Sequence, residues 1–354
     1  MSTTIATIER ITSVEPHPNA DRLDVVKVLG FQVVTGKDNF KVGDDVFYFP
    51  PDLLLPEAEA DKLGVTNYLK HAVFPGEETK RPCRVGAARL RGIPSYGFVA
   101  PVDVSPVPME AYDVGQDVTD WFGAEKYVPP VRVGCGEAER DFGTFHQYTN
   151  IENIQRYPDL IPEGTDVIIT EKIHGTNCRM GLCRDNSGEH IFMAGSHKVN
   201  RKSGEGLYWS FFTDKLKEGL SFMSDIHGGA DVILFGEIFG PGVQDMHYGQ
   251  TEKVFRAFDM TIDGKYVNYE ALQHFCRGLG VEMVPEIYIG PFSHAVCESY
   301  TYGDTTFGVT GGFKGREGIV IKPLIEQTDR VGRRMIAKSV SADYLNRKGA
   351  EDNE

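Results

Sequence analysis

The chain has 354 residues, 41% of them hydrophobic and 25% charged, which is the composition of an ordinary globular protein with room for two domains. Its formal net charge of −14 is shared evenly, since the first 145 residues contain 15 basic and 22 acidic residues and the remainder 22 and 29. A protein coated in positive charge for nucleic acid is therefore excluded, and any such site must be a local patch or depend on metal ions.

The cysteines and the apolar runs predict the compartment. None of the six cysteines forms a C-x-x-C pair or a zinc-site spacing, so we expect unpaired thiols in a reducing cytosol. No basic segment followed by an apolar run opens the chain, and no apolar run approaches the ~20 residues that span a bilayer. We therefore expect a cytoplasmic protein with no signal peptide and no membrane partner. The cysteines are Cys83, Cys135, Cys178, Cys183, Cys276 and Cys297.

The N-terminal part of the chain predicts a small β-barrel, because short apolar runs alternate with closely spaced turn signals. Residues 17–23, HPNADRL, form a turn that resembles the start of OB modules that bind transfer RNA; a purely structural use of this turn is the alternative. We predict an OB-fold-like module over residues 1–125. Its strands are expected over residues 5–14, 25–28, 31–34, 46–49 and 96–99, with a short helix over 57–63.

The densest basic cluster of the N-terminal half flanks the last of these strands. It consists of KRPCR at residues 80–84 and RLRG at residues 89–92. One interpretation is a solvated strand face. The other is that Arg89 and Arg91 contact the backbone of a nucleic acid.

Residues 126–147 predict a linker because they contain Pro129-Pro130, several glycines and mixed charge. A second domain is expected over residues 148–345, followed by a polar tail over 346–354. Its strands are expected over residues 166–169, 191–194, 231–239, 253–260 and 319–321. Helices are expected from the spacing of Trp209, Phe212, Leu216 and Leu220, with Phe211 and Phe222 also in the core, and from Asn268 to Gly280 after an Asp263-Gly264 hairpin turn. Strands and helices together predict an α+β domain.

The stretch TEKIHGTN at residues 170–177 follows an apolar, β-branched strand. It places Lys172 at the strand end, where desolvation disfavours the charged ammonium, and the neutral amine is a nucleophile. Gly175 lets the backbone approach a ligand, and Asn177 adds hydrogen-bonding groups. A surface lysine before a turn is the alternative interpretation.

Further downstream, Glu237 lies in an otherwise apolar strand, where a carboxylate is costly unless it is paired or binds a ligand. Phe258, in RAFDM, is by itself expected to be a core residue. Two more segments combine charge with apolar residues: EGIVIK at residues 317–322 and MIAKS at 335–339.

These segments resemble, in their order along the chain, the motifs of the covalent nucleotidyltransferases, which are the ATP-dependent ligases and the capping enzymes. The form K-x-H-G-T-N is similar to the RNA ligase branch, whereas DNA ligases and capping enzymes usually carry aspartate where His174 stands. The resemblance implies an ATP-grasp-like domain of antiparallel sheets with helices. It also implies that Lys172 attacks the α-phosphate of ATP and keeps AMP as a phosphoramide.

The same resemblance implies roles for the other residues. Glu171 would face the adenine amino group, Asn177 would belong to the nucleotide site, Glu237 would hold the ribose, and Phe258 would stack on the base. Glu317 would act on a hydrated Mg²⁺ or Mn²⁺ ion, Lys322 would contact phosphate, and Lys198 would receive the RNA end. Lys338 falls in the fifth motif, where Ile336 replaces the usual first lysine, so that Arg333 or Arg334 is the candidate for that role.

Only 16 residues follow Lys338, which cannot form the C-terminal OB domain of DNA ligases and capping enzymes, because a sheet needs several strands of ~5–6 residues each. An N-terminal OB module before the catalytic domain is similar to one clade of ATP-dependent RNA ligases. We therefore expect a monomeric enzyme that seals RNA 3′-hydroxyl and 5′-phosphate ends, at nicks, through lysyl-AMP. The alternatives are a DNA ligase, a capping-type nucleotidyltransferase, or a non-catalytic protein that binds RNA ends.

Overall fold

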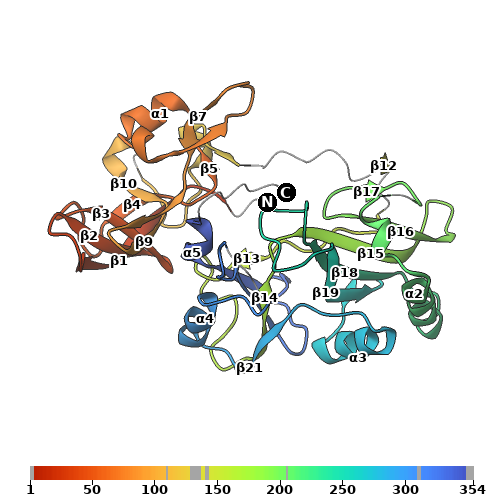
Figure 1. Ribbon diagram of the computed structural model, residues 1–354. Helices are drawn as coiled ribbons and strands as arrows, with labels where there is room; N and C mark the ends of the chain where they lie inside the picture. Colours follow the sequence, from red (N-terminus) through yellow and green to blue (C-terminus); the bar gives the residue numbers. More distant parts are fainter. Residues whose placement is uncertain are drawn as a thin grey trace. The chain divides into compact units, whose positions relative to one another are not determined.

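The computed structural model describes residues 4–108, 111–127, 137–139, 143–204, 206–308 and 312–347. The chain divides into two compact units (Figure 1). Unit 1 comprises residues 1–128, 152–159 and 340–347, and unit 2 comprises residues 129–151, 160–339 and 348–354. Most of the predicted linker, including Pro129-Pro130, lies outside the described residues, as do Cys135 and residues 348–354 of the predicted tail.

Unit 1 is built from antiparallel sheets. The larger sheet has the strand order β10-β4-β1-β2-β3, and a second sheet has the order β11-β5-β7-β6. In the core of unit 1, Phe47 and Phe49 of β4 each pack edge to face on Phe122 of the short helix η3. The elements are β1 (Thr7–Pro16), β2 (Leu23–Val28), β3 (Phe31–Gly36), β4 (Asp45–Phe49), β5 (Leu53–Leu54), α1 (Glu57–Lys62), η1 (Thr66–Tyr68), β6 (Lys70–Val73), β7 (Lys80–Arg84), β8 (Ala87–Leu90), β9 (Ile93–Tyr96), β10 (Phe98–Pro101), η2 (Val102–Val104), η3 (Thr119–Phe122) and β11 (Glu125–Lys126).

The predicted strand over residues 96–99 is wrong, because the chain changes direction at Gly97. Strand β9 ends at Tyr96 and pairs with β8, whereas β10 begins at Phe98 and pairs with β4. Gly97 has a φ of +75°, and a Cβ atom there would lie 2.0 Å from the carbonyl oxygen of Phe49. Only glycine fits this position.

The HPNADRL turn follows β1 and forms hydrogen bonds with the β8–β9 hairpin. The ring of His17 is buried, and its Nε2 lies 3.0 Å from the carbonyl oxygen of Leu90. The Asn19 backbone N–H donates to His17 Nδ1 at 3.0 Å, and the Asn19 side chain donates to the carbonyl of Arg91, also at 3.0 Å. These contacts give the turn a structural role in unit 1.

Two segments from elsewhere in the chain complete unit 1. Residues 152–159 include strand β13 (Glu152–Asn153), and the backbone N–H of Gly30 donates to the carbonyl of Gln155 at 2.7 Å. Residues 340–347 include helix α5 (Ala342–Leu345), which packs on β8. Arg89 forms an ion pair with Asp343 of this helix. Unit 1 is therefore assembled from three separate stretches of sequence.

Unit 2 contains two antiparallel sheets. One has the order β12-β17-β16-β15-β18-β19-β20, and in the other β23, β22, β14 and β21 are successive neighbours. Helices α2 and α3 cover the first sheet, where Leu216 and Leu272 pack with Met180, Leu234 and Met260. The elements are β12 (Ala138–Glu139), β14 (Asp166–Lys172), β15 (Thr176–Arg184), β16 (His190–Ser196), β17 (Asn200–Arg201), η4 (Trp209–Phe211), α2 (Asp214–Ile226), β18 (Val232–Phe239), β19 (Val254–Ile262), β20 (Lys265–Tyr266), α3 (Tyr269–Leu279), β21 (Glu286–Pro291), α4 (His294–Thr301), β22 (Gly318–Pro323) and β23 (Ala337–Val340).

Local sequence signals explain most of these boundaries. Thr213 begins α2, because its hydroxyl accepts from the backbone N–H of Leu216, and the preceding aromatic residues form the separate η4 turn. Gly280 ends α3 in the left-handed conformation with a φ of +69°. Two expectations are wrong in detail: Phe222 is 62% exposed rather than in the core, and Asn268 makes no cap hydrogen bond to α3. Its side-chain oxygen instead accepts from the backbone N–H of Glu326 at 2.8 Å.

Within the described ranges, no helix is both long and apolar enough to cross a membrane. Five cysteines are unpaired and buried, and burial raises the pKa of the Cys276 thiol to about 12 and that of Cys297 to about 11.

Candidate active site

The β14–β22 ladder brings the predicted nucleophile beside the predicted metal-binding acid. Lys172 is the last residue of β14 and pairs with Gly318, the first residue of β22. Glu317 precedes that glycine, and its Oε1 lies 2.5 Å from Lys172 Nζ. The side chain of Lys172 is 25% exposed and that of Glu317 only 8%. A reachable amine therefore sits against a buried carboxylate.

The turn after Lys172 packs against β18, which carries Glu237. Asn177 and Glu237 are partners in the β15–β18 ladder. A Cβ atom on Gly175 would lie 2.3 Å from the carbonyl oxygen of Ile238 and 2.9 Å from Cγ of Glu237. Gly175 thus permits a close approach to β18, in addition to any approach to a ligand. Glu237 is consequently held beside the turn that follows the nucleophile.

A loop after β18 braces this turn through contacts that were not expected from the sequence. His174 Nε2 lies 2.7 Å from Oδ1 of Asp245, and the His174 backbone N–H donates to the Tyr248 hydroxyl at 2.6 Å. The Gln244 amide donates to the carbonyl of Gly175 at 3.3 Å. Burial raises the pKa of Tyr248 well above its ordinary value, so the phenol is neutral. These partners satisfy the polar ring of His174, which is buried.

The carboxylate of Glu171 is held by the loop that precedes β22. It accepts hydrogen bonds from the Thr305 hydroxyl, from the Thr306 backbone N–H at 2.8 Å and from the Thr306 hydroxyl at 2.7 Å. Ionised carboxylates have about four acceptor positions, so three of them are occupied. A contact between Glu171 and adenine stays a prediction.

Phe258 lies at a bulge in β19. In the β18–β19 ladder Phe235 pairs with Asp259 and Gly236 pairs with Ala257, which leaves Phe258 without a partner position. The ring of Phe258 packs on that of Tyr148, with 4.9 Å between the ring centroids. Phe258 is therefore partly buried on the face of the sheet opposite to α2 and α3.

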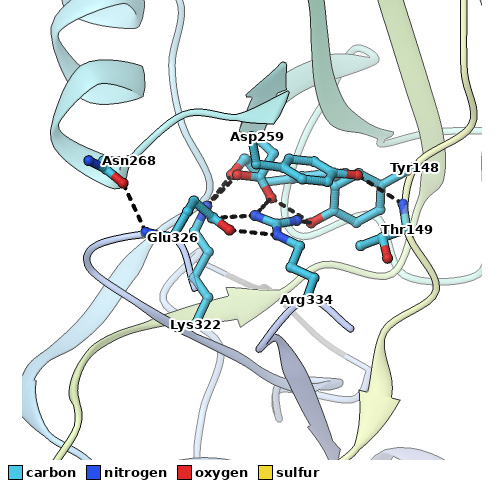
Figure 2. A network of polar contacts seen from close by, with 9 residues as sticks. Tyr148, Thr149, Asp259, Asn268, Lys322, Glu326 and Arg334 are labelled. Atoms are coloured by element: carbon cyan, nitrogen blue, oxygen red, sulfur yellow. Dashed lines mark hydrogen bonds and ion pairs between the residues drawn. The ribbon is translucent and has the colours of Figure 1, made fainter. Parts of the chain in front are cut away.

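A buried network of charges joins the two sheets next to this bulge (Figure 2). Asp259 Oδ1 lies 2.5 Å from Lys322 Nζ, and Asp259 Oδ2 lies 2.8 Å from Nη2 of Arg334. Tyr148 donates its hydroxyl to Asp259 Oδ2 at 2.6 Å, and Glu326 binds Arg334 at 2.5 Å. Burial alone would raise the pKa of Asp259, but the charges of Lys322 and Arg334 outweigh it and hold the pKa below its usual range.

In this network, two cations that were predicted to bind phosphate contact carboxylates of the protein. Lys322 contacts Asp259 and the carbonyl oxygen of Phe258, and Arg334 contacts Asp259 and Glu326. Asp259 was not singled out from the sequence, although its position in an apolar strand carried the same signal as that of Glu237. Binding of phosphate by Lys322 stays a prediction.

The remaining predicted residues fall in three places. Lys338 lies in β23, the neighbour of β22, and Arg333 is paired with Asp329 at 2.7 Å. Lys198 is exposed in the turn between β16 and β17. In unit 1, Arg89 also donates to the carbonyl of Gly92 at 2.9 Å, and Arg91 has a φ of 48° in the β8–β9 turn. The structure thus groups Lys172 with Glu317, Asn177 and Glu237, and groups Phe258 with Lys322.

The donor set around Lys172 fits a hydrated divalent ion. Glu317 Oε2 and Asn177 Oδ1 are buried acceptors without a hydrogen-bond partner among the described residues. The same part of the chain contains no cluster of three carboxylate, histidine or cysteine ligands that could enclose a metal. Mg²⁺ typically keeps several waters and binds one or two carboxylates together with substrate phosphates. Glu317 is suited to such an ion.

Comparison with known proteins agrees with the geometry. A family model described as RNA ligase matches residues 165–340, and a model of an OB-fold domain matches residues 5–102. A mutant of Naegleria gruberi RNA ligase with ATP and Mn is 25% identical, covers 96% of this chain and 98% of that chain, and has a TM-score of 0.79. A mutant in the apo form is 25% identical with a TM-score of 0.80, covering 97% and 98%. A third, with AMP and Mn, is 25% identical with a TM-score of 0.79, covering 97% and 98%.

These matches confirm the predicted α+β body behind an N-terminal OB-fold module. They place every segment of the nucleotidyltransferase resemblance, from Lys172 to Lys338, inside the region that the RNA ligase model matches. Residues 165–340 of the chain are an RNA ligase domain, and an OB-fold domain precedes it over residues 5–102.

Proposed function

We propose that this ATP-dependent RNA ligase joins an RNA 3′-hydroxyl to a 5′-phosphate through an AMP that is held covalently on Lys172. The observation that carries the proposal is the distance of 2.5 Å between Lys172 Nζ and Glu317 Oε1, at the end of the β14–β22 ladder. Relatives that were solved with ATP and Mn, and with AMP and Mn, support the choice of nucleotide and metal.

In the first step the neutral amine of Lys172 attacks the α-phosphorus of ATP. A nitrogen–phosphorus bond forms, and the bond to the β-phosphate oxygen breaks, so that pyrophosphate leaves with the electron pair. Glu317 Oε1 is within hydrogen-bonding distance of the amine and is placed to accept the proton that it loses. Glu317 Oε2 would hold a Mg²⁺ or Mn²⁺ ion, which supplies positive charge against the phosphate when bound.

The nucleoside is held in place so that the attack occurs in line. Glu237 and Asn177, which pair across β15 and β18, would accept hydrogen bonds from the ribose hydroxyls. Phe258 would stack on the base, a contact worth about 1–3 kcal/mol. Lys322 and Lys338 are the candidate phosphate ligands, with Arg334 in the role that Ile336 cannot fill. Fixing the phosphate against Lys172 replaces a bimolecular encounter by a reaction within the complex.

In the next steps AMP passes from Lys172 to the RNA 5′-phosphate, forming a phosphoanhydride, and the 3′-hydroxyl then displaces AMP to seal the strand. Lys198 would contact the RNA end, and Arg89 and Arg91 would contact the RNA backbone. A nick in duplex RNA is the proposed substrate. The enzyme would act as a monomer. A reducing compartment such as the cytosol is proposed because buried, unpaired cysteines are typical there.

The test of the nucleophile is adduct formation with α-labelled ATP and Mg²⁺, read on a denaturing gel. The wild-type chain should retain label and Lys172→Ala should retain none, whereas Lys265→Ala, at the exposed β19–β20 turn, should match the wild type. Label on Lys172→Ala would refute the assignment. An adduct with labelled GTP instead of ATP would indicate a capping-type enzyme, and sealing of nicked DNA in preference to nicked RNA would indicate a DNA ligase. RNA binding without an adduct would favour a non-catalytic protein.

A further inference from the structure

The bulge in β19 has a stereochemical consequence for the residues beside it. Neighbouring residues of a regular strand point to opposite faces, but an extra residue interrupts this alternation. Ala257 and Met260 both pack under α2 and α3, although three positions separate them. Phe258 and Asp259 therefore share the opposite face, where Phe258 contacts Tyr148 and Asp259 accepts a hydrogen bond from it.

One cation of the other sheet contacts both of these neighbours. Lys322 Nζ, on β22, lies 2.5 Å from Asp259 Oδ1 and donates to the carbonyl oxygen of Phe258 at 3.1 Å. Lys322 is 5% exposed and Asp259 1%, so neither contact is loosened by water. A change at Asp259 must consequently be felt at the Phe258 backbone and at the Lys322 ammonium together.

The network contains two positive and two negative side chains, which are paired with one another. Two cations, Lys322 and Arg334, are shared between two carboxylates, Asp259 and Glu326. Tyr148 donates its hydroxyl to Asp259, and its ring packs on Phe258. Figure 2 shows the side chains of Tyr148, Lys322 and Arg334 converging on Asp259. Asp259 is the one member that touches Lys322, Arg334 and Tyr148. Without it, Lys322 would keep its hydrogen bond to the Phe258 carbonyl, whereas Arg334 would keep Glu326 and the Tyr148 hydroxyl. Its loss would therefore loosen the contacts that hold the Phe258 ring and leave Lys322 in place.

We propose that Asp259 is a positioning residue for nucleotide recognition, which fixes the Phe258 ring for stacking by holding Tyr148 against the bulge. This inference rests on the proposed function, because it assumes that ATP binds next to Lys172. Asp259 touches neither Lys172 nor Glu317 among its described contacts. Its removal should therefore weaken the binding of ATP and leave the chemical step at Lys172 nearly intact.

The test measures lysyl-AMP formation as a function of ATP concentration. Asp259→Asn keeps the shape of the side chain and removes its charge, and the expected result is a KM for ATP raised about tenfold, within the range of one lost base stack, with kcat within threefold of the wild type. The control is Asp231→Asn, which removes another buried carboxylate, in the residue just before β18, that is paired with Arg184 at 3.4 Å. It should lower the melting temperature and leave KM unchanged.

A double-mutant cycle distinguishes positioning from general damage. If Asp259 acts through the ring, Asp259→Asn in a Phe258→Leu background should raise KM no further than Phe258→Leu alone. Effects that multiply would overturn the proposal. If Asp259→Asn fails to fold, Tyr148→Phe takes its place in the same cycle. This variant removes one hydrogen bond and no charge, and it should raise KM about two- to threefold.

The outcomes also separate this inference from the function on which it rests. Absence of a labelled adduct in the wild-type chain would refute the function itself. A normal adduct in the wild type together with an unchanged KM in both Asp259→Asn and Tyr148→Phe would refute only the role of Asp259.

Discussion

Replacement of Gly175 by alanine adds a single methyl group and tests the geometry of the turn that follows Lys172. The new Cβ would lie 2.3 Å from the carbonyl oxygen of Ile238 and 2.9 Å from Cγ of Glu237, whereas ordinary contacts begin at 3.4 Å. The carbonyl belongs to the backbone of a central strand, β18, and cannot rotate away. The turn that follows Lys172 must therefore retreat.

The required retreat is about 1 Å, and misplacement of a reacting group by about 1 Å costs on the order of a hundredfold in rate. The same crowding should lower the free energy of unfolding by about 1–3 kcal/mol, as overpacking of a core does. We therefore expect Gly175→Ala to fold but to form lysyl-AMP about a hundredfold more slowly at saturating ATP.

The assay is single-turnover adduct formation with labelled ATP, together with thermal unfolding. The control is Gly278→Ala, an exposed position in α3 where a Cβ meets nothing within 4 Å. It should preserve the rate and stabilise the helix by up to ~1 kcal/mol. Wild-type rate and stability in Gly175→Ala would show that the turn does not rest against β18.

Two further predictions concern unit 1. Burial raises the pKa of Glu9 more than the neighbouring Arg156 lowers it, so the stability that Glu9 contributes is present at acid pH and is lost as the pH rises through its raised pKa. Glu9→Gln should therefore raise the melting temperature at pH 7.5 and change it less at pH 4; a larger gain at pH 4 would contradict this sign. Arg89→Ala/Arg91→Ala should weaken the binding of duplex RNA and reduce the slope of log affinity against log salt by about 1.8, because each of the two phosphate contacts contributes about 0.9. An unchanged slope would leave both arginines with structural roles alone.

The proximity of Lys172 and Glu317 in the candidate site could be predicted because both lie at the ends of buried strands. An amine after the β14 run and an acid before the β22 run are readable from local patterns, and antiparallel pairing of the two strands places them together. The end of α3 at Gly280 and the Asp263-Gly264 hairpin were readable for the same reason, since each is determined by a few adjacent residues.

The contacts that could not be predicted join residues far apart in the sequence. Asp259 and Lys322 are 63 positions apart, and Glu171 and Thr306 are 135 positions apart. No local periodicity encodes such a pair, and a bulge such as that at Phe258 changes which face a side chain occupies. The break at Gly97 was missed because its cause, the carbonyl of Phe49, lies on another strand.

The assembly of unit 1 from three stretches of sequence has a practical consequence for dissecting the protein. A fragment that stops at residue 128 would expose the surfaces on which residues 152–159 and helix α5 rest, and Gly30 and Arg89 would lose their partners Gln155 and Asp343. Removing only the last dozen residues of the chain would delete most of the same helix and spare the matched ligase region, which ends at residue 340. A loss of activity after this C-terminal truncation would therefore reflect damage to unit 1, although the deleted residues follow the ligase region in the sequence.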